Sequence, residues 1–243
     1  MKCIVAKDMK QASRTIADMF KTTVLEKPGA LLGLATGGTV TEIYRCMCAD
    51  YADGKVDFSK ARTVNLDEYI GLPHSHEQSF AYFMDVHLFS KTNFVRENIH
   101  LYDGSKDPNY EVDKMSKFLD ANTIDILMLG IGNNGHIGFN EPDSRFIDIP
   151  HCADLAEETI EANSRFFDNR DEVPRSAFTI GMRDIVKAKK VVLAAFGAQK
   201  AGAVKKLFAD NYIDPMLPCS ILKLIPEAYV IVDKPLADAA GIQ

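Results

Sequence analysis

The chain of 243 residues contains no apolar run that approaches the ~20 residues needed to span a bilayer. The apolar part of residues 1–8 is too short for a signal peptide, and we expect the first strand there. The five cysteines are odd in number and scattered, and no set of cysteines and histidines completes a zinc site. We therefore expect a cytoplasmic protein with reduced cysteines, no membrane anchor and no bound metal.

The sequence also lacks a basic stripe. Its formal net charge is −6, and its 28 lysines and arginines are dispersed along the chain. Proteins that bind nucleic acid usually gather such residues on one face, so no nucleic-acid partner is expected. The content of 47% hydrophobic and 26% charged residues is ordinary for a soluble globular enzyme.

Short apolar runs alternate with amphipathic stretches along the chain. This pattern predicts βαβ units, and hence a doubly wound, largely parallel α/β sheet with helices on both faces in a Rossmann-like three-layer fold. No repeat, low-complexity tract or Pro/Gly-rich linker divides the sequence, so we expect a single domain over residues 1–243. The predicted strands are residues 2–6, 30–35, 62–66, 124–130, 191–196 and 228–232, and the predicted helices are residues 9–25, 39–51, 79–88, 112–119, 155–167 and 199–208.

Chemically suggestive residues directly follow four of the predicted strands. In an open parallel sheet, ligands bind outside the carboxyl ends of the strands. We therefore expect these segments to meet at one rim of the sheet and to form one site there. They are residues 36–39, residues 67–69, the segment from residue 130 onward, and residues 197–200.

Two of these segments suit an anion such as phosphate. Gly37 and Gly38 allow backbone N–H groups to face an anion at the start of a helix, where the dipole adds positive charge. The alternative is a glycine turn with Thr39 as the helix N-cap, and both roles can hold together. Lys200, in the first turn of another predicted helix, opposes the dipole there, so it either binds a ligand anion or is a solvated surface charge. Arg165 either holds an anion at the edge of a pocket or is a partly covered surface residue.

The other two segments suit acid/base chemistry. Asp67 and Glu68 end a predicted strand, where desolvation can raise the pKa of a carboxyl toward neutrality and suit it to proton abstraction next to a carbonyl. The alternative is an exposed pair of loop acids. His136 lies between glycines at the predicted rim, and Glu141 can hydrogen-bond its ring and set its tautomer. No Gly-x-Ser-x-Gly elbow, and no cysteine in a rim loop beside a base, indicates a covalent nucleophile.

Together these segments resemble the glucosamine-6-phosphate deaminase family. The similarity runs in family order over nearly the whole chain, and its most specific motifs are Asn65-Leu-Asp-Glu-Tyr69 and Gly135-His-Ile-Gly-Phe-Asn-Glu-Pro142. The resemblance implies a doubly wound α/β enzyme of amino-sugar catabolism that acts on a sugar phosphate. It also implies that neither a metal nor a redox cofactor is needed.

The resemblance implies a role for each matching residue. Asp67 would take the C2 proton of open-chain glucosamine 6-phosphate and return it at C1, and water would hydrolyse the resulting imine to give fructose 6-phosphate and ammonia. His136 would catalyse ring opening, with Glu141 orienting its ring. The residues that would hold the phosphate are Gly37, Gly38, Thr39, Arg165 and Lys200.

The sequence departs from the family pattern in two places. Many members carry Asp at the position of Asn134; because an amide cannot offset the charge of an imidazolium, we expect His136 to depend more on Glu141. Allosteric members carry a serine/arginine/lysine cluster where this chain has residues 143–150, so neither their activation nor their hexamer is predicted. The chain is expected to be a monomer or a homo-oligomer, and residues 143–175, irregular at their start, are the candidate for a lid.

Two alternative functions remain open. A 6-phosphogluconolactonase has a similar fold and a related glycine-rich motif with a histidine, but lactone hydrolysis needs no base above C2. A sugar-phosphate sensor would carry a DNA-binding helix-turn-helix ahead of this fold, whereas the first predicted strand here begins at Lys2. We therefore expect the deaminase, with the lactonase as the nearest alternative.

Overall fold

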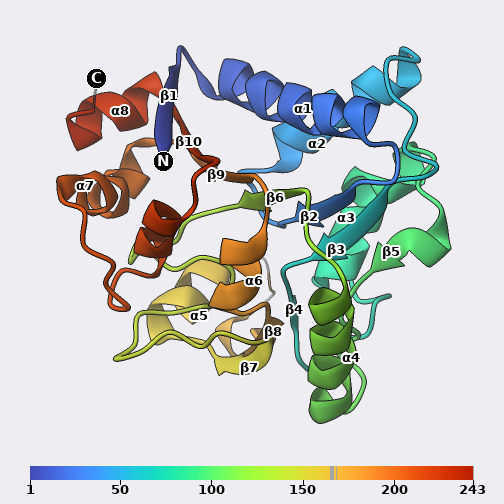
Figure 1. Ribbon diagram of the computed structural model, residues 1–243. Helices are drawn as coiled ribbons and strands as arrows, with labels where there is room; N and C mark the ends of the chain where they lie inside the picture. Colours follow the sequence, from blue (N-terminus) through green and yellow to red (C-terminus); the bar gives the residue numbers. More distant parts are fainter. Residues whose placement is uncertain (165–166, 168, 243) are drawn as a thin grey trace.

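The computed structural model describes residues 1–164, 167 and 169–242, and only the backbone of residues 158, 162 and 163. Its centre is a seven-stranded sheet in which all neighbouring strands run parallel (Figure 1). This confirms the doubly wound α/β fold. In spatial order the strands are β1 (Lys2–Ala6), β10 (Ala228–Asp233), β9 (Val191–Ala195), β6 (Ile126–Leu129), β2 (Leu31–Leu34), β3 (Arg62–Asn65) and β5 (Ile99–His100).

The direction in which the chain crosses this sheet reverses between two central strands. From β2 the chain moves through β3 to β5 at one edge, returns to β6 beside β2, and continues through β9 and β10 toward the other edge. At such a reversal the loops after the two central strands leave in opposite directions and open a crevice. The loops after β2 and β6 therefore flank the expected ligand site.

The central strands β2, β6 and β9 are buried along their whole length. Their sequences are almost entirely apolar, as expected for parallel strands that are covered on both faces. In Figure 1, α1 and α2 lie above the large sheet, whereas α4, α6 and a second, smaller sheet lie below it. The helices are α1 (Met9–Glu26), α2 (Thr41–Ala52), α3 (Phe80–His87), α4 (Pro108–Ala121), α5 (Glu157–Ser164), α6 (Met182–Lys187), α7 (Ala201–Ala209) and α8 (Lys234–Ala240), and the 3₁₀ segments are η1 (Phe89–Lys91), η2 (Arg96–Asn98), η3 (Arg170–Glu172), η4 (Ala198–Lys200) and η5 (Pro218–Leu224).

Helix starts account for the largest differences from the predicted boundaries. The helix predicted from residue 39 begins at Thr41, and no side chain caps it, so the prediction of Thr39 as N-cap was wrong. The helix predicted from residue 112 begins earlier, because Asp107 accepts a hydrogen bond from the backbone N–H of Tyr110 and a proline opens the first turn. The helix predicted from residue 199 is a 3₁₀ turn as far as Lys200 and α-helical from Ala201.

The small sheet was not predicted. It has three antiparallel strands, β4 (Asp67–Tyr69), β8 (Ser176–Thr179) and β7 (His151–Asp154), in that spatial order. Residues 143–150, the start of the segment proposed as a lid, contain no helix or strand, and β7 and α5 follow them. Leu66 joins the two sheets: its N–H donates to Leu34 O of the large sheet, and its carbonyl accepts from the N–H of Ile180, next to β8.

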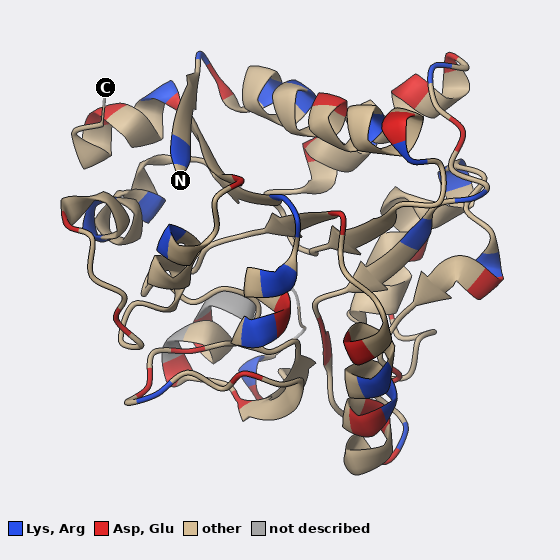
Figure 2. Ribbon diagram, in the orientation of Figure 1, with Lys and Arg blue, Asp and Glu red and all other residues tan. Residues whose placement is uncertain are grey.

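No helix among the described residues is both long and apolar enough to cross a membrane. All five cysteines are free thiols. Figure 2 shows lysines and arginines interspersed with acids over the described chain, without a stripe of one sign.

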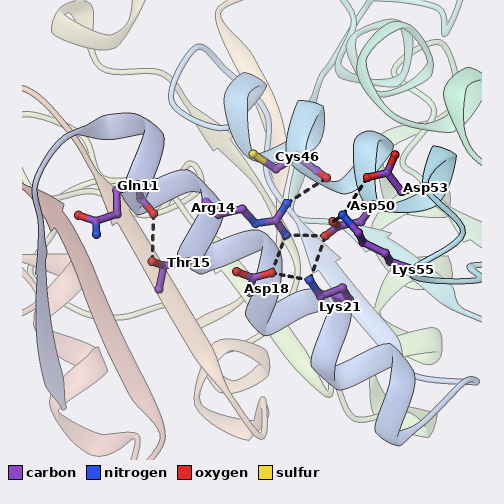
Figure 3. A network of polar contacts seen from close by, with 9 residues as sticks. All are labelled: Gln11, Arg14, Thr15, Asp18, Lys21, Cys46, Asp50, Asp53 and Lys55. Atoms are coloured by element: carbon purple, nitrogen blue, oxygen red, sulfur yellow. Dashed lines mark hydrogen bonds and ion pairs between the residues drawn. The ribbon is translucent and has the colours of Figure 1, made fainter.

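A buried carboxylate ties α1 to α2 on the upper side of the sheet. Asp50 of α2 forms ion pairs with Arg14 at 2.5 Å and Lys21 at 3.4 Å, both from α1 (Figure 3). Arg14 also donates to Asp18 and to the carbonyl of Cys46. Because the Asp50 side chain is only 4% exposed, it depends on these cations for solvation.

We expect Asp50→Asn to lower the free energy of unfolding by about 2 kcal/mol, because it leaves three cations, Arg14, Lys21 and Lys55, facing a buried amide. The partial exposure of Arg14 and Lys21 keeps the loss below that of a fully buried pair. Urea unfolding followed by circular dichroism measures the effect. Asp53→Asn removes an exposed acid from the same helix end and should leave the midpoint unchanged; equal midpoints for both variants would contradict the prediction.

Candidate active site

A cavity of about 1060 Å³ opens at the carboxyl ends of β2 and β6, where the chain direction reverses. All four segments expected at the rim contribute to its lining. The predicted site residues that line it are Gly37, Gly38, Thr39, Asp67, Asn134, His136 and Lys200. Glu141 lies behind His136 and lines a smaller cavity on the other side of the loop. Arg165 lies outside the described residues.

Asp67 is the deepest acid of the cavity. It is 8% exposed, and its Oδ1 has no hydrogen-bond partner among the described residues. Burial, and secondarily the charge of Glu68, raises the pKa of Asp67 to about 8. The alternative of an exposed loop acid is therefore wrong for both residues, because Glu68 is also buried. A carboxyl with this pKa can exchange a proton with a ligand near neutral pH.

The small sheet positions Asp67. In the pairing of β4 with β8, Asp67 lies opposite Thr179. The Thr179 hydroxyl oxygen accepts hydrogen bonds from the backbone N–H of Phe139 at 3.1 Å and from the Asn140 side-chain amide at 3.3 Å. The base candidate and the loop that carries His136 are therefore held to the same residue of β8.

His136 and Glu141 form a hydrogen-bonded pair in that loop. Their Nδ1 and Oε2 atoms are 3.2 Å apart, and Glu141 also accepts from the Asn134 amide at 2.7 Å and from the Thr159 hydroxyl at 2.5 Å. Burial alone would raise the pKa of Glu141, but the bond and charge of His136, with the bonds from Thr159 and Asn134, lower it to about 2. Glu141 therefore stays ionised, orients the ring and can balance a positive charge on it.

Asn134 contacts the backbone of His136 and not its ring. Its carbonyl oxygen accepts from the His136 N–H at 3.1 Å, while its amide donates to Glu141. An aspartate could not make this second contact in its ionised form. In this chain the residue therefore helps to hold Glu141 beside the imidazole.

Two turns, one before α2 and one before α7, line the cavity. Gly37 has a φ of 101° in the turn that precedes α2. Lys200 closes the η4 turn at the N-terminus of α7, and the N–H at the start of this turn, that of Gly197, donates to Asp233 at 3.0 Å. The backbone N–H groups at the first turn and the ammonium at the second suit a phosphate.

The sequence did not predict the aromatic wall of the cavity. Tyr69 and Phe80 have ring centroids 4.7 Å apart, and Phe80 stacks on Phe139 at 6.0 Å. These rings come from three distant segments, and nothing local distinguishes them from core aromatics. Arg170 also lines the cavity, where it pairs with Glu157 and Glu161 of α5. The sequence did not predict the role of Thr159 either, because its contact with Glu141 joins residues 18 positions apart.

Gly138 lies in the loop that carries His136 and leaves little space between this loop and Asp67. Its φ is 58°, and an added Cβ would lie 2.9 Å from Thr179 Oγ1 and 3.6 Å from Asp67 Oδ2. We expect Gly138→Ala to lower kcat at least tenfold, because displacement of about 1 Å in an active site can cost more than that. Gly54→Ala, at a φ of 68° with open space around it, should cost stability but leave kcat unchanged. Steady-state kinetics on both variants makes the comparison, and equal kcat values would refute it.

The described residues contain no group of three or more His, Cys, Asp or Glu placed to hold a metal ion. The cavity brings together, at one rim, the buried Asp67 carboxyl, the His136 ring that pairs with the ionised Glu141, and two turns that suit an anion. Such a set can move protons on a small anionic ligand.

Comparisons with known proteins agree on one family. The model of the glucosamine-6-phosphate isomerases/6-phosphogluconolactonase family matches residues 6–229. The glucosamine-6-phosphate deaminase of Clostridioides difficile (strain 630) is 44% identical over 98% of this chain and 96% of its own length. The deaminase of Thermoanaerobacter pseudethanolicus is 42% identical over 98% of this chain and 94% of its own length.

Solved structures give the same result for the fold. A monomeric glucosamine-6-phosphate deaminase superposes with a TM-score of 0.95 at 35% identity, covering 98% of this chain and 100% of that one. A 6-phosphogluconolactonase from Trypanosoma brucei superposes with a TM-score of 0.79 at 15% identity, covering 98% and 97%. The second similarity is one of fold alone.

Proposed function

Because the chain belongs to the glucosamine-6-phosphate isomerase/6-phosphogluconolactonase family, we propose that it is a glucosamine-6-phosphate deaminase. It would convert glucosamine 6-phosphate and water into fructose 6-phosphate and ammonia. The relatives at 42–44% identity bear this activity in their names, whereas the lactonases share only the fold at 15–18% identity. The observation that carries the proposal is the buried Asp67 carboxyl at the cavity, because lactone hydrolysis needs no such base.

In this proposal the phosphate of the substrate binds at one end of the cavity. The backbone N–H groups of Gly38 and Thr39 and the ammonium of Lys200 would hold it, with Arg165 as a further expected ligand. Anchoring one end fixes the reacting carbons relative to the acid/base groups, which can supply several kcal/mol of the barrier. The aromatic wall would exclude water from the same space.

The proton transfers would use two groups. His136, oriented by Glu141, would move a proton between the anomeric hydroxyl and the ring oxygen and so open the ring. Asp67 would then take the proton from C2 while O1 gains a proton, which gives an enolamine. Return of the proton at C1, with loss of one proton from the nitrogen, converts the enolamine into an imine at C2. Water adds to that imine and ammonia leaves, so the reaction balances without an oxidant or a reductant. An ammonium on C2 would favour the ionised form of Asp67.

A coupled assay tests the proposal directly. Purified protein should release ammonia and fructose 6-phosphate from glucosamine 6-phosphate and should not hydrolyse 6-phosphogluconolactone. Lactone hydrolysis without ammonia release would overturn it. We further propose that the enzyme acts in the cytoplasm as a monomer or a homo-oligomer, which light scattering distinguishes. The same assay with added N-acetylglucosamine 6-phosphate should show no activation.

A further inference from the structure

Glu68 is a second buried acid beside the proposed base, and the proposed mechanism gives it no role. Glu68 is 2% exposed and lies in β4 directly after Asp67. We propose that Glu68 is a positioning residue, which holds the Asp67 carboxyl at the cavity by fastening β4 to the first turn of α3. This inference rests on the proposed deaminase function.

The contacts of Glu68 are all with backbone N–H groups. Its Oε1 accepts from Tyr69 and from Phe80, and its Oε2 accepts from Ala81, each at 2.9 Å. Phe80 and Ala81 are the first two residues of α3, whose N-cap is Ser79. The first N–H groups of a helix have no partner within it and carry the positive end of its dipole, so a carboxylate suits this place. Ser79 caps the next group, since its hydroxyl accepts from the N–H of Tyr82 at 3.0 Å.

The position of Asp67 depends on the backbone of β4. Successive side chains of a strand point to opposite faces, so Glu68 faces away from Asp67 and toward α3. Strand β8 holds one edge of β4, where Glu68 lies opposite Phe178. On the side of α3, Glu68 connects β4 to the helix through hydrogen bonds, and the Tyr69 ring packs against the Phe80 ring. Since Asp67 Oδ1 has no partner in the part of the chain that the structure describes, the strand itself must hold it in place.

Glu68 also influences the proton affinity of its neighbour. Burial raises the pKa of Asp67, and the charge of Glu68 raises it further. Burial likewise raises the pKa of Glu68, against the three backbone N–H groups and the charge of His74, which lower it. Tyr44 and Tyr102 approach from α2 and from the segment after β5; burial raises their pKa values, and the charge of Asp67 adds to this.

The remaining charged and titratable groups that line the cavity are Tyr69, Glu77, His87, His136, Glu157, Glu161, Arg170 and Lys200. Strand β8 adds no titratable side chain opposite β4. A change in the pH dependence of Asp67 after substitution of Glu68 can therefore be assigned to the charge of Glu68, provided that the rest of the cavity keeps its structure.

The test is Glu68→Gln in the full chain, assayed by ammonia release from glucosamine 6-phosphate across pH 5–10. An amide can serve only part of the three N–H groups and carries no charge. We expect kcat to fall at least tenfold, with KM changed less than threefold, because the phosphate site is untouched. We expect the acid limb of kcat/KM, where activity rises with pH, to move to lower pH by at least ~0.5 unit, because a negative neighbour of Asp67 is lost.

Glu111→Gln is the matched control. Glu111 is 1% exposed, accepts from the N–H of Asp103 at 2.8 Å, pairs with Lys114 and lies outside the cavity. The variant Glu111→Gln should lose stability but keep the wild-type kcat and pH profile. Wild-type kcat and an unmoved limb in Glu68→Gln would overturn the inference, and so would a uniform loss of activity with an unmoved limb. No ammonia release by the wild type would instead overturn the proposed function.

Glu68→Asp decides the matter if Glu68→Gln does not fold. It keeps the charge but is too short to reach all three N–H groups, so kcat should fall at least tenfold while the acid limb stays within ~0.2 unit of the wild type. Wild-type kcat in Glu68→Asp would show that the reach to α3 does not matter, and the inference would fail.

Discussion

Asp67→Asn should lower kcat by about 10³-fold or more, because it removes the group proposed to carry the C2 proton. Binding of substrate or of a non-reacting sugar phosphate should stay within about tenfold, since the phosphate site is separate and an amide fills the same space. Steady-state kinetics and calorimetric binding measure the two effects. Retention of more than a tenth of the activity would overturn the assignment of the base.

The same variant should be more stable than the wild type in alkali. The pKa of Asp67 is about 8 in the folded chain, whereas an unfolded aspartate has a pKa near ~3.9. Between these values the folded state binds more protons than the unfolded state, so the stability from Asp67 is fully present below pH ~4 and is lost as pH rises through about 8. We expect Asp67→Asn to raise the melting temperature by at least ~2 °C at pH 9 and to change it little at pH 4.

Asp184→Asn is the matched control for stability. Asp184 is a buried acid of α6 whose pKa is raised by burial, and it does not line the cavity. Asp184→Asn should gain stability in alkali, as Asp67→Asn does, while keeping its activity.

In the wild type, kcat/KM should rise from pH 7 to pH 9 as Asp67 ionises. If kcat/KM does not change between pH 7 and pH 9, the buried Asp67 carboxyl is not the catalytic base.

Glu141→Gln should lower kcat about 10²-fold, the second largest effect that we expect. Glu141 accepts from Asn134, His136 and Thr159, and its pKa of about 2 keeps it charged at any working pH. The glutamine amide carries no charge to balance a protonated ring. Its N–H₂ group would also face one of the groups that donate a hydrogen bond to Glu141 in the wild type. The loss should exceed that in Thr159→Val, which deletes one hydrogen bond and leaves the contact with His136 intact.

Two measurements decide this second prediction. Ammonia release gives kcat for both variants, and NMR titration of the His136 ring reports whether its tautomer or charge has changed. Equal kcat values for Glu141→Gln and Thr159→Val would contradict the prediction. An unaltered ring spectrum in Glu141→Gln would show that the carboxylate does not orient the imidazole.

The sequence predicted six of the seven strands of the large sheet, because its central strands β2, β6 and β9 are apolar runs; the two-residue strand β5 was not predicted. Leu31–Leu34 and Val191–Ala195 differ from their predicted limits by no more than one residue at each end. The rule that ligands bind at carboxyl ends then placed Asp67 and His136 at one cavity. Local pattern and fold class were sufficient for this part.

The remaining features depend on contacts between distant segments. The strands of the small sheet have three or four residues each, too few for a clear alternation. Glu68 and Phe80 meet across 12 positions, and Glu141 and Thr159 across 18. The burial that raises the pKa of Asp67 also comes from tertiary packing, and no spacing in the sequence encodes it.

Leu66 belongs to neither sheet, yet its N–H bonds to β2 of the large sheet and its carbonyl to Ile180, directly after β8 of the small one. Adding or deleting one amino acid at this junction would shift the register of β3 against β2 or of β4 against β8, and would turn alternate side chains to the wrong face. Length variation among descendants of this gene should therefore accumulate in surface connections such as the exposed residues 53–55, while the link between residues 65 and 67 keeps a constant length.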